Sequence, residues 1–453
     1  MKQLRISIGG VRGIVGEALT PDIAVGFAQA FGTYVGGGRI LVSRDTRRSG
    51  PMVVQCVIAG LLGAGCEVVD LDICPTPALQ LAVRDSEAAG GIAVTAGHND
   101  ARWNALKFIR PDGIFLNPRE AQELLEIYHQ GEFAKATWSQ LRPVGRDHGA
   151  AERHLHAILE QVDVEAIRRA GLRVAVDCAN GACSPWSPKL LEALGCEAVA
   201  INTEVDLPFP HPPEPSPRNL GQLSALVRAS GADVGFAHDA DGDRLGIVAE
   251  NGTPLGEELT ICLAEEMLLS RGDPGPVVVN LSTTSAVDVI ARRYDREVIR
   301  TKIGQAYVCE AALNYCAAVA GEGSGGVVVP RLNYANDSMA VMAHILELIA
   351  KRQVPVSELV RETVPPLHMV KLVVPCGMDQ VFGVLERIRN HRPPDWAVSE
   401  NLDDGIKYIG EDCWVHVRAS QTEPLIRVIA EAEDATLAEE IARDFVALVR
   451  RSM

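Results

Sequence analysis

The chain has 453 residues, of which 47% are hydrophobic and 23% are charged. At about 150 residues per domain, this length predicts about three domains with large cores, and the composition excludes disordered and fibrous proteins. The 59 acidic and 43 basic residues leave a net charge of −16, which disfavours nonspecific binding to nucleic acid or to anionic membranes. An anionic ligand would therefore need positive charge that is concentrated locally.

The cysteine content and the start of the chain bear on the cellular compartment. The 11 cysteines include no Cys-x-x-Cys pair, which argues against a disulfide framework or a structural zinc site. Arg12 and Glu17 lie where a signal peptide would need an apolar stretch, and no later segment is predicted to span a bilayer. We expect a cytoplasmic protein.

Strand and helix patterns alternate along the first third of the chain. Apolar runs typical of strands lie at residues 40–43, 67–73 and 91–95, and they alternate with helical patterns at residues 52–65 and 76–84. Alternation of this kind favours a parallel α/β sheet.

One segment of this pattern is repeated. Residues 61–69 (LLGAGCEVV) recur in similar form at residues 191–199 (LEALGCEAV), and each copy reads as a helix end, a glycine suited to a C-cap and a following strand. Two related α/β domains are therefore expected. A third copy is indicated by strand, helix and strand patterns within residues 277–300, with chance similarity between βαβ units as the alternative.

Glycine, proline and charge gather where the patterning breaks, at residues 142–149, 250–257 and 362–368. The breaks predict four domains, at residues 1–147, 148–253, 254–366 and 367–453. The last segment reads as a small α+β domain that ends in a helix at residues 436–450. The proline-rich residues 206–217 are predicted to form an extended surface loop, because proline is excluded from helix interiors and inner strands.

The strongest chemical motif is HDADGDR at residues 238–244, between two apolar runs. Side chains two residues apart point the same way in extended backbone, so Asp239, Asp241 and Asp243 can converge on one hard cation, for which Mg²⁺ is the natural candidate. A calcium-binding loop is less well supported, because no glycine follows at the required position. A solvated acidic turn is disfavoured, because three crowded carboxylates repel one another.

Two polar loops carry groups that could bind a ligand. The segment RASQTEPLIR at residues 418–427 offers two arginines and two hydroxyls as an anion cradle; a hydrogen-bonded turn with surface arginines is the alternative. In the segment GEGSGG at residues 321–326, Glu322 and Ser324 could bond vicinal hydroxyls of a sugar. This glycine-rich loop lacks the lysine of a nucleotide P-loop and the spacing of the dinucleotide fingerprint.

A fourth loop follows a predicted strand end, where parallel sheets form their sites. It reads TAGHND at residues 95–100 and continues to WNALK at residues 103–107. Its histidine, asparagine and lysine suit proton transfer and phosphate binding. A capped helix start with an incidental lysine is the alternative.

All four segments in this order, with GGVRG at residues 9–13 and RDTR at residues 44–47, resemble the α-D-phosphohexomutase family over essentially the whole chain. The resemblance implies an α/β fold with three related mixed-sheet domains and a C-terminal α+β phosphate-binding domain around a central cleft. It also implies interconversion of the 1-phosphate and 6-phosphate of a hexose or hexosamine, with Mg²⁺, an active-site phosphoserine and a hexose bisphosphate intermediate. We expect a monomer or homodimer whose partner is a small sugar phosphate, with no nucleic acid or membrane.

The resemblance also implies a role for each matching residue. The metal ligands match Asp239, Asp241 and Asp243, and the group beside the reacting phosphoryl matches Arg244. The sugar-selecting loop matches Glu322 and Ser324. The distal phosphate loop matches Arg418, Ser420, Gln421, Thr422 and Arg427. The general acid–base candidates match Lys107 and Lys302. Phosphate-region groups of the first domain match Arg12 and His98.

One loop departs from the family at two positions. The nucleophile loop of the family reads Thr-Ala-Ser-His-Asn-Pro, whereas this chain has Gly97 at the serine and Asp100 at the proline. Glycine cannot carry a phosphoryl group, and it also leaves the metal without the oxygen that the phosphoserine supplies. Thr95 and His98 are conceivable substitutes, but in-line transfer tolerates little misplacement, so we expect neither to serve. The sequence leaves open whether the glycine is natural or a replacement.

The sugar loop and the WNALK segment resemble those of phosphoglucosamine mutases, which we therefore favour. Phosphomannomutase and phosphoglucomutase are the alternatives within the family. A different class of function, a sugar-phosphate-binding protein with impaired catalysis, is motivated by Gly97.

Overall fold

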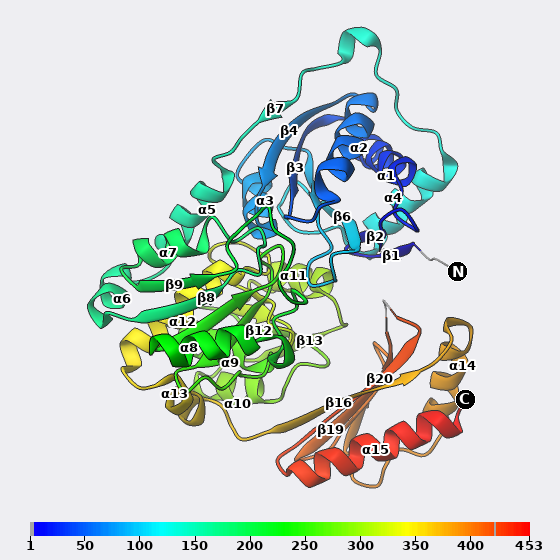
Figure 1. Ribbon diagram of the computed structural model, residues 1–453. Helices are drawn as coiled ribbons and strands as arrows, with labels where there is room; N and C mark the ends of the chain where they lie inside the picture. The colour runs from blue at the N-terminus through cyan, green and yellow to red at the C-terminus, as the bar shows by residue number, and fades with distance from the viewer. Residues whose placement is uncertain (1–3, 421–422) are drawn as a thin grey trace.

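The computed structural model describes residues 4–420 and 423–453. Its strands form four sheets of seven, four, four and five strands, which follow one another along the chain. Figure 1 shows the N-terminal sheet in blue, the two central sheets in green and yellow, and the C-terminal sheet in orange and red. The predicted succession of three α/β units and an α+β unit is confirmed.

The first sheet has the strand order β1-β2-β6-β5-β3-β4-β7. Its strands are β1 (Arg5–Ser7), β2 (Gly10–Ile14), β3 (Gly38–Arg44), β4 (Cys66–Ile73), β5 (Gly90–Val94), β6 (Trp103–Ile109) and β7 (Gly145–Arg146). The helices of this region are α1 (Pro21–Tyr34), α2 (Gly50–Gly63), α3 (Thr76–Arg84) and α4 (Pro118–Gln130), with a 3₁₀ turn, η1 (Trp138–Gln140).

Successive side chains of the inner strands point to opposite faces of this sheet and pack against different helices. Ile40 and Val42 of β3 pack in a core with α1 and α2, whereas Leu41 packs in a separate core with α3. Successive side chains of a strand point to opposite faces, so a continuous apolar run buries both. The sheet is therefore covered on both sides.

The second and third sheets repeat one topology. Their strands are β8 (Arg173–Asp177), β9 (Glu197–Ile201), β10 (Val234–His238) and β11 (Leu245–Ala249), then β12 (Val277–Asn280), β13 (Val298–Thr301), β14 (Val319–Gly321) and β15 (Val327–Val328). The orders β9-β8-β10-β11 and β13-β12-β14-β15 match β4-β3-β5-β6 of the first sheet, and in each the last strand is antiparallel. The third copy predicted from the sequence is therefore a true repeat.

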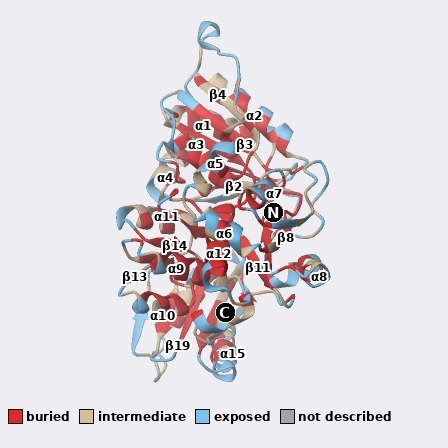
Figure 2. Ribbon diagram, turned by 90° about the vertical axis from the view of Figure 1, so that its left-hand side faces the viewer, coloured by how far each residue is buried: buried red, intermediate tan, exposed pale blue. Residues whose placement is uncertain are grey.

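The helices of the central region link these two sheets. They are α5 (Ala150–Leu159), α6 (Val164–Ala170), α7 (Ser187–Ala193), α8 (Gly221–Ser230), α9 (Glu258–Ser270), α10 (Ala286–Arg293), α11 (Gln305–Asn314), α12 (Ser338–Arg352) and α13 (Val356–Thr363), with a 3₁₀ turn, η2 (Pro217–Asn219). Every residue of α12 from Ser338 to Ala350 is buried, as the red ribbon in Figure 2 shows. A helix that is buried all round belongs inside a core. Helices α9 and α12 join both sheets in one core.

The C-terminal sheet is antiparallel throughout and has its own core. Its strands, in the order β16-β20-β19-β18-β17, are β16 (His368–Pro375), β17 (Ser399–Asn401), β18 (Ile406–Ile409), β19 (Cys413–Ala419) and β20 (Leu425–Ala432), and its helices are α14 (Met378–Arg389) and α15 (Ala435–Arg451). Side chains of both helices pack on this sheet. The predicted small α+β domain is confirmed.

Two local predictions also hold. Gly65 and Gly195, which end the helices of the repeated segment, have φ of +87° and +77°, a conformation that glycine adopts without the steric penalty of a Cβ. The proline-rich segment forms neither helix nor strand from residue 202 until η2. No helix of the described part of the chain is long and apolar enough to cross a membrane.

The C-terminal domain docks on the third domain through buried polar groups. The carboxylate of Glu431 accepts hydrogen bonds from the backbone N–H of Ser285 (2.8 Å) and from the indole N–H of Trp414 (2.7 Å). Lys407, only 2% exposed, lies over the Trp414 ring and donates to the Leu281 carbonyl at 2.6 Å. This lysine is therefore buried at the junction.

The burial of Lys407 makes stability depend on pH. Burial, reinforced by Arg300, lowers the pKa of Lys407 to about 7, below its unfolded pKa of about 10.4. The unfolded chain therefore binds more protons between these values, so stability rises with pH across that interval. We expect the free energy of unfolding to rise between pH 7 and pH 9 more steeply in the parent protein than in Lys407→Met, by at most about 1.4 kcal/mol per pH unit.

Urea denaturation at three pH values measures this difference. Lys135→Met, at an exposed lysine, is the matched control and should follow the parent protein. Parallel pH profiles for the parent and Lys407→Met would show that this lysine is not responsible.

Candidate active site

Side chains from all four domains line one cavity of about 780 Å³. Most of the residues singled out in the sequence meet there: Arg12, Gly97, His98, Lys107, Asp243, Arg244, Glu322, Ser324, Arg418, Ser420 and Arg427. The cavity therefore joins four loops that are far apart in the sequence. Gln421 and Thr422 lie outside the described residues.

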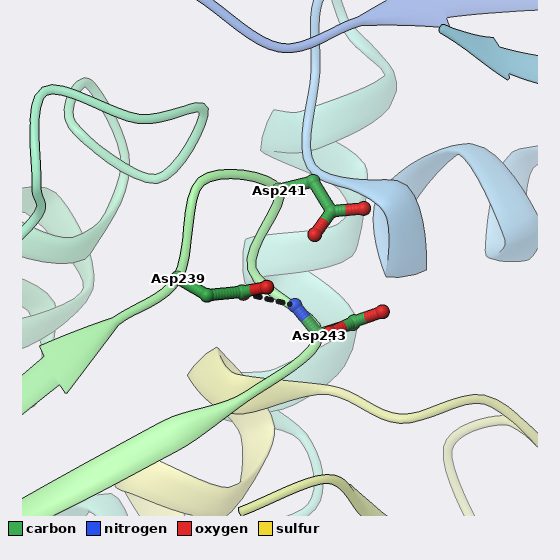
Figure 3. Close-up of side chains that lie close together, drawn as sticks. All are labelled: Asp239, Asp241 and Asp243. Carbon is green, nitrogen blue, oxygen red and sulfur yellow. Dashed lines mark hydrogen bonds between the residues drawn. The ribbon is translucent and has the colours of Figure 1, made fainter. Parts of the chain in front are cut away.

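The aspartate motif lies on the loop between β10 and β11 (Figure 3). Each of Asp239, Asp241 and Asp243 offers a carboxylate oxygen within 4.8 Å of the others. The loop closes on itself because Asp239 Oδ1 accepts hydrogen bonds from the backbone N–H groups of Asp243 (3.0 Å) and Arg244 (3.1 Å). Gly242, with φ of +76°, makes the tight turn that brings the carboxylates together.

Groups of the first domain reach this loop. Lys107 Nζ donates to Asp241 Oδ2 at 2.7 Å and to Asp243 Oδ2 at 3.0 Å, and Thr76 Oγ1 donates to Asp241 Oδ2 at 2.6 Å. Burial alone would raise the pKa of Asp241, but the ammonium of Lys107 outweighs it and lowers this pKa to about 2. In return Asp241 and Asp243 raise the pKa of Lys107 despite its burial. Lys107 is therefore a cation held by the aspartate loop.

The aspartate loop fits a hard cation. Asp239 Oδ2 and Asp241 Oδ1 are buried and accept no hydrogen bond from the residues that the structure describes. Burial, with the charges of Asp243 and Asp241, raises the pKa of Asp239 well above its usual value. A bound divalent cation would offset the repulsion among the three carboxylates and would give the two unpartnered oxygens a ligand contact. These oxygens are ligands of the kind that Mg²⁺ prefers.

Position 97 faces this cation site. Gly97 has φ of +53°, and a Cβ built on it would lie 3.3 Å from Asp241 Oδ1, 3.5 Å from Asp239 Oδ2 and 3.7 Å from Lys107 Nζ. A side chain at this position would thus point at the carboxylates and the lysine. Glycine supplies no oxygen there.

The loop around Gly97 is held by Arg47, which is 2% exposed. The Arg47 guanidinium pairs with Asp45 at 2.8 Å and donates to the carbonyls of Gly97, Asn99, Asp100 and Trp103. The conformation of the loop therefore depends on a buried arginine and not on a side chain at position 97. Sequence reasoning noted the RDTR segment without giving Arg47 this role, because its acceptors are carbonyls about 50 residues away.

The two conceivable substitute nucleophiles differ in their surroundings. Thr95 Oγ1 donates to Asp45 Oδ2 at 2.7 Å and accepts from the Gly97 N–H at 3.0 Å, and the residue is buried. It is thus engaged in the loop. His98 lines the cavity, where Arg244 above all, together with burial, lowers its pKa well below the usual range. Its imidazole is therefore neutral near pH 7.

Comparisons with known proteins match this architecture. The models for domains I, II, III and the C-terminal domain of phosphoglucomutase/phosphomannomutase match residues 6–135, 152–252, 255–367 and 378–448. A "Probable phosphoglucosamine mutase" of Methanopyrus kandleri is 36% identical over 98% of this chain and 97% of its own length.

The chain belongs to the phosphohexomutase family. The family consists of enzymes, intramolecular phosphotransferases that are classed as isomerases. A Thermococcus kodakarensis relative named phosphoglucomutase/phosphomannomutase is also 36% identical, over 97% of this chain and 96% of its own length. A crystal structure of a phosphoglucomutase/phosphomannomutase family protein from Burkholderia thailandensis superposes with a TM-score of 0.87 at 27% identity, covering 99% of this chain and 97% of that one.

The sugar-facing loops of this phosphohexomutase come from the third and fourth domains. Glu322 Oε1 accepts hydrogen bonds from Asn280 Nδ2 (2.7 Å) and from the Gly304 N–H (3.1 Å), which fixes the carboxylate. Arg418, 6% exposed, lies directly across from Arg427 in the β19–β20 ladder. Burial lowers the pKa of Arg418, and Arg427 adds to the effect. The fourth domain thus brings concentrated positive charge to the cavity.

Three of the expected residues that the structure describes do not themselves line the cavity: Asp239 and Asp241, which belong to the buried aspartate loop, and Lys302. Lys302 is exposed and does not line the cavity, whereas its neighbours Ile303 and Gly304 do. Its role as an acid–base group stays a prediction. The structure instead adds Asn280, which the sequence analysis missed because a lone asparagine at a strand end carries no motif.

Proposed function

We propose that this phosphohexomutase binds a hexosamine monophosphate together with Mg²⁺ in the four-domain cavity, and that phosphoglucosamine is its preferred substrate. One observation carries the proposal. The buried aspartate loop, position 97 and Lys107 meet at one place in a cavity that also holds two sets of arginines. A sugar with a phosphate at either end suits such a distribution of charge.

The two sets of arginines support two phosphate positions. Arg12 and Arg244 lie in the cavity beside His98, in the part formed by the first and second domains. Arg418 and Arg427 belong to the fourth domain. In a chain of net charge −16, such clustering of arginine favours phosphate, which guanidinium groups bind by charge-assisted hydrogen bonds. Glu322 and Ser324 lie on a loop of the third domain, and their side chains suit the hydroxyls of the sugar.

The preference for phosphoglucosamine rests on the relatives. Several of them, from Methanopyrus kandleri, Thermococcus gammatolerans and Pyrococcus abyssi, carry the name "Probable phosphoglucosamine mutase". A Thermococcus kodakarensis relative is named phosphoglucomutase/phosphomannomutase. Glucose phosphate and mannose phosphate are therefore the second candidates for the substrate. The proposal includes a cytoplasmic location and no macromolecular ligand.

The mechanism that we propose assigns distinct tasks to the residues present. Arg418, Ser420 and Arg427 hold the phosphate that does not react, and Glu322 orients the sugar. Arg12 and Arg244 hold the reacting phosphoryl group next to position 97. Asp239, Asp241 and Asp243 would bind Mg²⁺, which would neutralise charge on that group.

Mutase turnover also needs an acceptor for the phosphoryl group at position 97. In covalent phosphoryl relay the acceptor is an oxygen or nitrogen nucleophile, and Gly97 has neither. We therefore propose a protein that binds Mg²⁺ and sugar phosphate but has little mutase activity.

Replacing Arg418 tests the proposed phosphate site. We expect Arg418→Ala to bind glucosamine 6-phosphate about 10- to 100-fold more weakly, because hydrogen bonds to charged groups contribute about 1.5–3 kcal/mol. Isothermal titration calorimetry measures the affinity, and circular dichroism checks the fold. Arg392→Ala, at an arginine of the same domain that is 86% exposed, is the matched control. Equal affinities of the parent and Arg418→Ala would refute this assignment.

A further inference from the structure

The space beside Gly97 is bounded by groups that suit a water molecule. A Cβ there would have Asp241 Oδ1, Asp239 Oδ2 and Lys107 Nζ as its nearest neighbours, at 3.3 to 3.7 Å. The two carboxylate oxygens are buried and accept no hydrogen bond from the described residues. A buried water needs a polar site with about two to four partners. Here it could donate to both carboxylates and accept from the ammonium, because each carboxylate oxygen has two lone pairs and can hold a cation as well.

The acceptor position itself is preserved although its side chain is gone. Arg47 binds four carbonyls of the 97–103 loop, so the backbone of Gly97 stays directed at the aspartate loop. The Thr95 hydroxyl is already engaged with Asp45 and the Gly97 N–H. The position beside Gly97 therefore suits an acceptor oxygen for the phosphoryl group, and no side chain of the described residues supplies that oxygen.

We propose that this protein is a sugar-phosphate hydrolase, in which a water molecule beside Gly97 accepts the phosphoryl group. The substrate class is hexose or hexosamine phosphates, including the bisphosphate. This inference rests on the proposed function, because the same cavity must first bind the sugar phosphate.

The hydrolytic step balances without any further reactant. A bond forms between the water oxygen and phosphorus while the bond between phosphorus and the sugar oxygen breaks. One proton of the water stays on the released phosphate, and the other passes through the solvent of the cavity to the sugar oxygen. The products are inorganic phosphate and a free sugar hydroxyl.

The residues present are suited to this step. Phosphoryl transfer asks the protein mainly for positioning and for stabilisation of charge, and little for covalent chemistry. Arg12, Arg244 and Lys107 line the cavity and supply positive charge. A serine would hold the phosphoryl group as an ester and pass it back to the sugar, whereas a water molecule carries it away.

The test compares the parent protein with two alanine variants in water enriched in ¹⁸O. Each protein is incubated with Mg²⁺ and one of two substrates, glucose 1,6-bisphosphate or glucosamine 6-phosphate. The released phosphate is quantified, and its ¹⁸O content is determined by mass spectrometry. In Gly97→Ala the methyl group fills the position of the water. Gly131→Ala is the matched control, because Gly131 also has a positive φ, of +69°, but a Cβ there meets nothing within 4 Å.

We expect the parent and Gly131→Ala to release phosphate that carries one ¹⁸O atom. Gly97→Ala should release it at least about tenfold more slowly, because the acceptor is displaced, while calorimetry shows that all three proteins bind the sugar phosphate and thermal melts show that they are folded. This combination supports hydrolysis by water beside Gly97.

Three results would overturn the inference while leaving the proposed function intact. They are binding of sugar phosphate without phosphate release by the parent, equal release by Gly97→Ala, and a phosphoryl group on His98 that forms before release. A parent protein that binds no sugar phosphate would instead refute the proposed function, and the hydrolase with it.

Discussion

The Gly97→Ser variant is expected to become phosphorylated at residue 97 by a hexose bisphosphate and to gain mutase turnover. A Cβ at this position points at Asp239 and Asp241, where a serine oxygen would meet the reacting phosphoryl group. Removing a nucleophile from a covalent catalyst can cost about 10⁶-fold in rate, so a gain of at least about 100-fold is a conservative expectation.

Replacing Gly97 with serine strains the backbone and crowds one carboxylate, but the loop at residues 97–103 can keep its conformation. Gly97 has φ of +53°, and a side chain in that conformation costs roughly 1–2 kcal/mol. A Cβ would lie 3.3 Å from Asp241 Oδ1, so this carboxylate must move by a few tenths of an ångström. The hydrogen bonds of Arg47 hold the backbone in place meanwhile.

A coupled assay of 1-phosphate to 6-phosphate conversion, with glucosamine, mannose and glucose substrates and the bisphosphate activator, measures the gain. Gly97→Ala is the control, because it has the same backbone strain without the hydroxyl. Two outcomes contradict the prediction. One is robust mutase activity of the parent protein with no phosphorylated residue at Thr95 or His98, and the other is a Gly97→Ser variant that binds substrate and stays inert.

Asp241→Asn is expected to weaken Mg²⁺ binding by at least about tenfold, since even residues around a metal's ligands are worth 10- to 100-fold in affinity. The change removes one of three converging charges and replaces a carboxylate oxygen with an amide. It also weakens the contact with Lys107 at 2.7 Å, so the lysine would be less firmly held in the loop. The loss of affinity for the cation is the diagnostic effect.

Calorimetric titration with MgCl₂ measures this affinity. Asp295→Asn is the control, because Asp295 is exposed and does not line the cavity. If Asp241→Asn binds Mg²⁺ as tightly as the parent protein, the metal assignment is wrong.

Features that depend on near neighbours in the chain could be predicted from the sequence. The helix expected at residues 76–84 is observed as α3 (Thr76–Arg84), and the first strand expected within residues 277–300 is observed as β12 (Val277–Asn280). The aspartate loop could be found for the same reason, since alternation over five residues already brings three carboxylates to one place. Gly97 stood out because the surrounding motif is otherwise nearly complete.

Features that depend on packing between domains could not be predicted in this way. The contact of Lys107 with Asp241 joins residues 134 positions apart, and the exposure of Lys302 contrasts with its place in a matching motif. Local periodicity determines which residues form helices and strands, because backbone geometry repeats over a few residues. Where those elements lie relative to one another depends on the burial of apolar surface between distant segments, such as the core that α9 and α12 share. The sequence therefore determined the domains and the chemical groups of this protein, and only the tertiary structure decided which groups meet in the cavity.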